Sequence, residues 1–89
     1  LTSIPNEISD LTNLQELGIT YNHLTSLPES IGNMSSLETL NLSNNNLTSI
    51  PSSLCDISSL YSLDVTNNNL CEEYHYDCID WWGEQDCQD

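Results

Sequence analysis

The hydrophobic positions of this chain recur with a fixed period of 23 residues. The string Leu-Thr-Ser-Ile/Leu-Pro begins at Leu1, Leu24 and Leu47. Further apolar side chains align at the same spacing, namely Leu14, Leu37 and Leu60, then Leu17, Leu40 and Leu63, then Ile19, Leu42 and Val65. Such a period, with leucines at set offsets, predicts a solenoid in which each unit buries its apolar side by stacking on its neighbours.

Each unit contains a short stretch in which buried and exposed positions alternate. The leucines at 17, 40 and 63 are each followed by a small or polar residue. This period of two predicts a short strand with one side in the core and one in solvent. The solvent-facing positions, with Tyr21 at their edge, are Glu16, Gly18, Thr20, Thr39, Asn41, Ser43, Ser62, Asp64 and Thr66.

Asparagines and prolines also align between units. Asn22, Asn45 and Asn68 follow the predicted strands, where a side-chain amide can satisfy backbone groups inside a turn. A proline begins the second half of each unit and favours an extended entry to it. The segments after the prolines, such as residues 28–34, are too short for a full helix, so we expect one or two turns of helix or 3-10 helix.

The consensus unit, LxxLxLxxNxLxxLPxxIxxLxx, resembles the leucine-rich repeat family in its 23-residue form, and the resemblance covers residues 1–70. It implies an α/β solenoid, a right-handed coil with short parallel strands on a concave face and 3-10 or short helical turns on a convex face. The family usually binds its ligands on the concave face, so the resemblance implies protein partners for the solvent-facing positions of the predicted strands.

The repeat pattern ends after Leu70, and residues 71–89 are expected to form a C-terminal cap of the same domain. Five large apolar residues gather there, namely Tyr74, Tyr76, Ile79, Trp81 and Trp82. An open repeat needs a cover. We therefore predict that they lie over the last core residues, which are Leu60, Leu63, Val65 and Leu70. A ligand-stacking role for the two tryptophans is the alternative.

The four cysteines lie in the last repeat and the cap, and their even number suggests two disulfides. Cys55 and Cys78 are one repeat apart, so continued stacking would make them neighbours on adjacent turns. This favours Cys55–Cys78 with Cys71–Cys87, and the alternative is Cys71–Cys78 with Cys55–Cys87. Disulfides indicate an oxidising compartment, and hence a secreted or cell-surface protein. The ending also resembles the cysteine-stapled caps of secreted repeat proteins.

The charge balance excludes several partners. The chain has no Lys or Arg and 14 acidic residues, which gives a formal charge of −14. Nothing could neutralise the phosphates of a nucleic acid or an anionic membrane surface. No cofactor or structural metal is predicted, although Glu72, Glu73 and Asp77 are weak candidates for Ca²⁺ ligands.

The first residue lies inside a repeat, so the first apolar positions need a cover. We expect Leu1, Ile4, Ile8 and Leu11 to pack against an upstream part of the same polypeptide or against another copy of the chain.

Three Asn-x-Ser/Thr sequons are candidate glycosylation sites, at Asn33, Asn41 and Asn46. A glycan on Asn41 would obstruct the predicted binding face.

The sequence offers no catalytic motif, which favours a non-enzymatic function. We predict an extracellular module that works through protein–protein contacts, as a structural or adhesive unit of a larger secreted or surface assembly, with a filament as one form that the assembly can take. One alternative is a recognition module of a receptor or inhibitor whose binding repeats lie upstream. A weaker alternative is ice binding through the aligned Thr2, Thr25 and Thr48.

Overall fold

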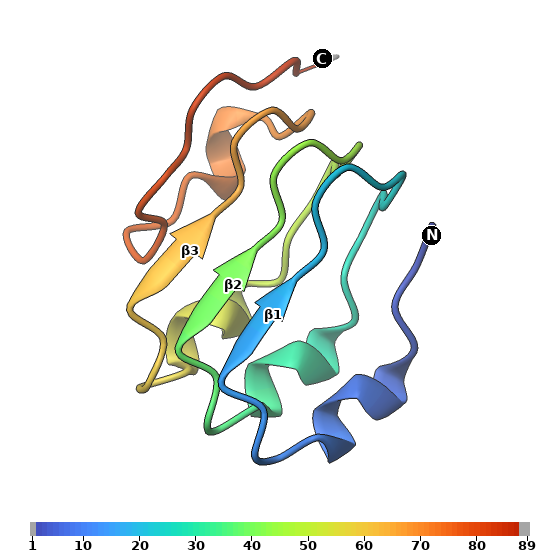
Figure 1. The fold of residues 1–89 in the computed structure, drawn as a ribbon. Helices are drawn as coiled ribbons and strands as arrows, with labels where there is room; N and C mark the ends of the chain where they lie inside the picture. Colours follow the sequence, from blue (N-terminus) through green and yellow to red (C-terminus); the bar gives the residue numbers. More distant parts are fainter. Residues whose placement is uncertain (1, 88–89) are drawn as a thin grey trace.

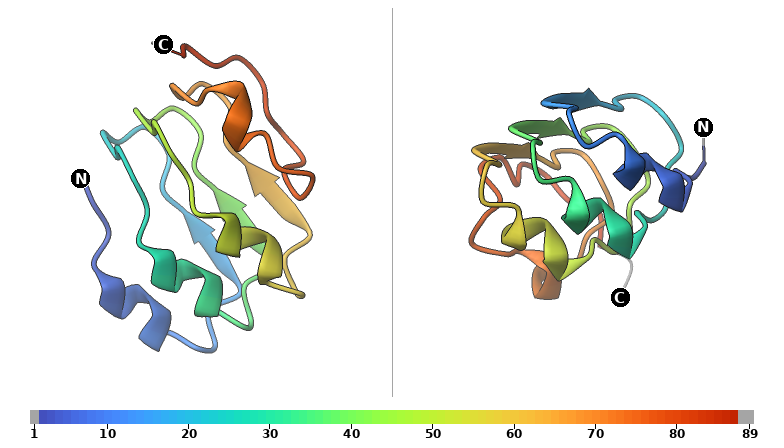
Figure 2. Two further views of the ribbon diagram at one scale, coloured as in Figure 1. Left: turned by 180° about the vertical axis from the view of Figure 1, so that it is seen from behind. Right: turned by 90° about the horizontal axis from the view of Figure 1, so that it is seen from below.

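The computed structural model describes residues 2–87. Three short strands, β1 (Glu16–Gly18), β2 (Thr39–Asn41) and β3 (Ser62–Asp64), form one parallel sheet in that order. Four 3-10 helices alternate with the strands, η1 (Asn6–Asp10), η2 (Glu29–Asn33), η3 (Ser52–Asp56) and η4 (Glu72–Tyr74). The sheet lies on one side of the coil and the 3-10 helices on the other, as Figures 1 and 2 show. Both kinds of element were predicted from the repeat, and both are confirmed.

Residues one repeat apart pair across the sheet. Leu17 pairs with Leu40, and Leu40 pairs with Leu63. The apolar side chains of successive turns therefore stack into one continuous core, whose fully buried members are Leu24, Ile31, Met34, Leu37, Leu40, Leu42, Leu47, Leu54, Leu63, Val65 and Leu70. We call the outward side of the sheet the strand face, which is the surface that the sequence predicts to be concave.

A proline in extended conformation precedes each of the first three 3-10 helices. Pro5, Pro28 and Pro51 all have φ near −70° and ψ between 138° and 154°. The ring fixes φ without a need for a backbone donor at that position. The serine hydroxyls of Ser30 and Ser53 donate to carbonyls of the preceding 3-10 helix at 3.0 and 3.1 Å, and so tie successive turns together.

The buried asparagines hold the turns after the strands. Asn45 accepts a hydrogen bond from the backbone N–H of Leu24 at 3.2 Å. Its side-chain nitrogen donates to the carbonyls of Ile19 and Leu42 at 2.7 and 3.0 Å. Asn68 repeats this pattern one turn later, with Leu47, Leu42 and Val65. Each amide therefore joins two turns of the coil.

The cap continues the coil as a shortened turn, in which Gln85 takes the position of the buried asparagine. Gln85 accepts from the N–H of Leu70 at 3.1 Å and donates to the carbonyls of Val65 and Trp82, both at 2.7 Å. Asn68 pairs with Gln85, which lies 17 positions later rather than the 23 of a full repeat. The longer side chain of Gln85 thus makes the hydrogen bonds to the backbone that asparagine makes in the full repeats, in a turn that is six residues shorter.

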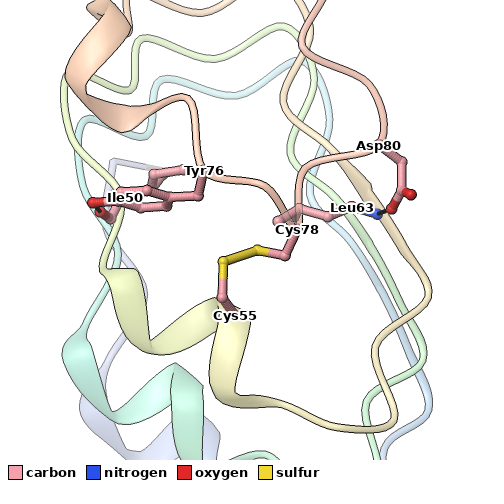
Figure 3. Close-up of a disulfide and its surroundings, with 6 residues drawn as sticks. All are labelled: Ile50, Cys55, Leu63, Tyr76, Cys78 and Asp80. Carbon is pink, nitrogen blue, oxygen red and sulfur yellow. Dashed lines mark hydrogen bonds between the residues drawn. A yellow bond between two sulfur atoms is a disulfide. The ribbon is translucent and has the colours of Figure 1, made fainter.

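The cap also closes the outer edge of β3. Leu63 donates its N–H to the carboxylate of Asp80 at 2.8 Å, and Val65 donates its N–H to the carbonyl of Trp81 at 2.9 Å. Figure 3 shows Asp80 beside Leu63. Edge groups of a sheet that would otherwise need water or another strand are thereby satisfied.

Two disulfides fasten the cap. Cys55, on η3, is joined to Cys78, and Cys71 is joined to Cys87. The Cα atoms lie 5.4 and 4.8 Å apart, respectively. Figure 3 shows the first bridge running from η3 to the cap beside Tyr76. The structure has the pairing that the repeat spacing favours, and not the alternative of Cys71–Cys78 with Cys55–Cys87.

One part of the predicted cap packing is wrong. Tyr74, Tyr76, Ile79 and Trp82 pack against the core, as expected. Trp81 does not, because its side chain is 59% exposed. The register of the shortened turn places it on the outward side of the coil.

Candidate functional site

The strand face carries the positions that the sequence proposes for ligand binding. Glu16, Gly18 and Asn41 are exposed, and Tyr21 is 79% exposed at the edge. The half-buried positions are Thr20, Thr39, Ser62, Asp64 and Thr66. Ser43 is buried and contributes little accessible surface, so it is the one candidate on this face that a partner could hardly reach.

The middle row of this face is longer than the sequence suggests. Gly18 pairs with Asn41, and Asn41 pairs with Asp64. Trp81 then pairs with Asp64 in the same parallel sense. The exposed indole therefore continues the row Gly18, Asn41, Asp64, and a middle row that the repeats leave without a large apolar side chain gains one from the cap.

Two polar side chains of this row are held by their own backbone. The side-chain oxygen of Asn41 accepts from the N–H of Ser43 at 3.1 Å. The carboxylate of Asp64 accepts from the N–H of Thr66 at 2.9 Å. Both side chains are thus fixed in place before any partner arrives, which lowers the entropy cost of binding.

The sequence analysis favoured Trp81 as a core-covering residue and kept a ligand-stacking role for the two tryptophans as the alternative. The available signal was weak. Gly83 and Gln85 follow Trp81 at the same spacing at which the small residue Thr66 and the amide residue Asn68 follow Asp64. Gly83 has φ of 62°, and a Cβ there would lie 2.4 Å from a side-chain carbon of Thr66. The shortened turn therefore requires glycine at this position.

Aromatic side chains make several contacts in the cap. The ring of His75 stacks on Trp82 with 4.2 Å between centroids, and His75 also contacts the carboxylate of Glu72 at 2.9 Å. The hydroxyl of Tyr76 donates to the carbonyl of Ile50 at 3.2 Å, as Figure 3 illustrates. The hydrogen bond of Tyr76 ties the cap to the last repeat, whereas the two contacts of His75 join residues within the cap.

Burial raises the pKa of the Tyr76 hydroxyl above its ordinary value of 10.0, and the neighbouring Tyr74, Glu73 and Glu29 raise it further. The hydroxyl therefore remains a protonated donor throughout the physiological pH range.

The proposed assembly end is only partly accessible. Ile4 is 8% exposed and belongs to the core, so it is not available to a second molecule as the sequence suggested. Ile8 is half-buried, whereas Leu11 is 51% exposed. An open depression of about 420 Å³ runs along residues 10–14 beside it. Leu1 lies outside the described residues.

The three candidate glycosylation positions, Asn33, Asn41 and Asn46, are all exposed. The side-chain nitrogen of Asn46 lies 3.5 Å from Nδ1 of His23. Asn41 is on the strand face, so a glycan there would compete with any partner of that face.

The acidic residues do not gather into an ion site. Glu72, Glu73 and Asp77 are exposed, and residues 2–87 hold no group of three or more side chains arranged to bind a metal ion. Within the same residues no helix is long and apolar enough to cross a bilayer.

Comparisons with known proteins agree with the repeat architecture. The family model described as Leucine rich repeat matches residues 12–70. A solved structure of a leucine-rich repeat protein from Leptospira interrogans matches with 43% sequence identity and a TM-score of 0.76. That match covers 79% of this chain and 18% of the Leptospira protein, so the chain spans less than a fifth of its length. No curated protein matches the chain.

Proposed function

Because the chain belongs to the leucine-rich repeat family, we propose that it is a non-enzymatic extracellular module that binds a protein partner through the strand face. We further propose that it acts as an adhesive or structural unit within a larger secreted or cell-surface assembly. The family is a protein-interaction fold, and the observation that carries the specific proposal is the exposed Trp81 in the middle row of that face.

The strand face has the composition of a small interaction surface. Tryptophan is among the residues enriched at the energetic centres of protein interfaces. Here it stands at the end of a row that contains Asn41 and Asp64, whose side chains are already fixed by hydrogen bonds. A partner would therefore contact one large apolar side chain beside polar groups that are already ordered, so binding would cost little side-chain entropy.

The disulfides support an extracellular location. All four cysteines of the chain are paired, and structural disulfides persist in secreted and surface proteins rather than in the reducing cytosol. The charge of −14, with no basic residue, is also suited to a medium that is rich in salt or divalent cations, which screen self-repulsion.

The larger assembly is proposed from the face beside η1. Leu11 is exposed there together with the depression along residues 10–14. An exposed apolar end of a solenoid is normally covered by the stacking of another structural unit on it. Either further repeats of the same polypeptide or a second molecule would supply the cover. The long Leptospira protein, of which this chain matches a small part, supports the first arrangement.

The proposal is tested by comparing partner capture by three immobilised proteins: the unchanged chain, Trp81→Ala and Tyr61→Ala. Tyr61 is a matched control because it is also an aromatic residue, is 68% exposed and lies outside the middle row. We expect the extracellular fraction of the source organism to contain proteins that the unchanged chain and Tyr61→Ala retain and Trp81→Ala loses. Equal retention by all three proteins would contradict the strand-face assignment.

A further inference from the structure

We propose that a second surface, at the exits of the strands, binds a neutral linear polysaccharide. We call this surface the turn ledge, and it consists of residues 21–23, 44–46 and 67–69, where three successive turns leave the sheet. It is separate from the middle row of the strand face. Tyr21 is the residue on which the proposal depends.

The backbone of Tyr21 is strained. Its φ is 54°, and the equivalent positions of the next two turns, Asn44 and Asn67, have φ of 60° and 58°. The turn therefore demands the left-handed region at this position in every repeat. Asparagine enters that region at modest cost, whereas a bulky aromatic residue there is an outlier. The first turn therefore carries tyrosine at a left-handed position where the next two turns carry asparagine, which tolerates that conformation better.

Packing within the chain does not account for the tyrosine. Its side chain is 79% exposed, so the ring stabilises no part of the core. Strained residues that bury nothing are found where a site needs the side chain. An exposed aromatic ring offers a flat apolar face with a polar hydroxyl at its tip, and such a ring can stack on the C–H face of a sugar.

Hydrogen-bonding side chains surround Tyr21. The ring borders an open depression of about 360 Å³, which is also lined by Asn22, His23, Asn44, Asn46 and Asn67. A second depression of about 440 Å³ continues from Asn67 toward the cap. Within residues 2–87 the side-chain amide of Asn22 donates to the carbonyl of Thr20 and that of Asn46 lies 3.5 Å from Nδ1 of His23, whereas the side-chain amides of Asn44 and Asn67 have no hydrogen-bond partner. An amide offers donors and an acceptor side by side, which matches the adjacent hydroxyls of a sugar ring.

The charge of the chain selects a neutral glycan. The first depression has no carboxylate in its lining, and the chain has no Lys or Arg with which to hold an acidic sugar. The net charge of −14 repels sulfated, phosphorylated and uronic polymers. A protein partner fits less well, because the centre of a protein interface is more apolar than this row of amides.

The regular spacing of the ledge favours a polymer. Adjacent parallel strands lie about 4.8 Å apart, so equivalent amides are presented at short, equal intervals along the coil. A linear glycan repeats its hydroxyl groups in the same regular manner. Tyr21 would hold one ring by stacking, and the amides of the following turns would bind the next rings.

The test is calorimetric titration of the 89-residue chain with cellohexaose, laminarihexaose, xylohexaose and mannohexaose, alongside an oligogalacturonate as the acidic probe. Tyr21→Asn is the informative variant because it installs the residue of the equivalent turns and relieves the strained backbone, so it keeps the fold. Tyr61→Asn is the matched control, since Tyr61 is an exposed tyrosine away from the ledge. Circular dichroism of each variant checks the fold.

We expect at least one neutral hexasaccharide to bind, Tyr21→Asn to weaken its affinity by about tenfold or more, and Tyr61→Asn to leave it unchanged. Absence of binding by all four neutral probes overturns the proposal. So does equal affinity of Tyr21→Asn and the unchanged chain, or tighter binding of the acidic probe. The protein-binding proposal rests on Trp81 and is tested by Trp81→Ala, whereas this proposal rests on Tyr21, so either one can fail without the other.

Discussion

Gln85 holds the cap to the last full repeat, and the substitution Gln85→Glu tests how much of the stability depends on it. The change keeps the side-chain length and an acceptor for the N–H of Leu70 but removes both donor hydrogens. The two donated bonds, to Val65 and Trp82, measure 2.7 Å each. At about 1 kcal/mol net for each bond, and about 1 kcal/mol more for a carboxylate facing two carbonyls, the expected loss is about 3 kcal/mol at pH 7.

The loss should diminish in acid. The two carbonyls disfavour the charged form of the introduced carboxyl, so folding raises its pKa above the ordinary glutamate value of about 4.3. The folded state then binds more protons than the unfolded state, and the variant loses stability as the pH rises through that pKa. Protonation restores one donor, so the deficit should shrink as the pH falls from 7 toward about 4.3.

The assay is urea unfolding followed by tryptophan fluorescence, which reports on the cap because both tryptophans, Trp81 and Trp82, lie there. Gln15→Glu is the control, since it makes the same change of charge at an exposed position. Subtracting the change in the free energy of unfolding of Gln15→Glu from that of Gln85→Glu removes the general effect of pH on a strongly acidic chain. A deficit below about 0.5 kcal/mol at pH 7, or one that does not change with pH relative to the control, would refute the role given to Gln85.

Three further predictions concern the backbone, the disulfides and the charge. Tyr21→Asn should raise the free energy of unfolding by about 1 kcal/mol in urea titrations, because Asn tolerates positive φ better, and a loss of stability would contradict the strain. Replacing both Cys71 and Cys87 by Ser, a bridge that spans 16 positions, should lower it by about 3 kcal/mol, whereas an unchanged midpoint would mean that the bridge does not stabilise the cap. CaCl₂ and NaCl at equal ionic strength should raise the melting temperature equally, and an excess with calcium would reveal a specific site.

The repeat made the three strands and the first three 3-10 helices predictable. Leu17, Leu40 and Leu63 had to face one side, and the residue after each had to face the other, because side chains alternate along a strand. The fixed spacing also set the register. It further favoured Cys55–Cys78, since residues one repeat apart lie on adjacent turns.

The cap was less predictable, because its turn is shorter than a repeat. A pattern of 23 residues cannot place Trp81 beside Asp64, which lies only 17 positions before it. The length of the Gln85 side chain makes the shorter turn possible, and this depends on contacts that no periodicity expresses. The strain at Tyr21 was equally hidden, since only the backbone angle shows that tyrosine occupies an asparagine position.

The most direct test of the account is a hydrogen–deuterium exchange footprint of the chain bound to the protein partner that Trp81→Ala fails to retain. The account predicts slowed exchange along the strand face, at Gly18, Asn41, Asp64 and Trp81, with η1, η2 and η3 unchanged. Protection confined to the 3-10 helices, with no change along that row, would show that the partner binds elsewhere and would contradict the central claim.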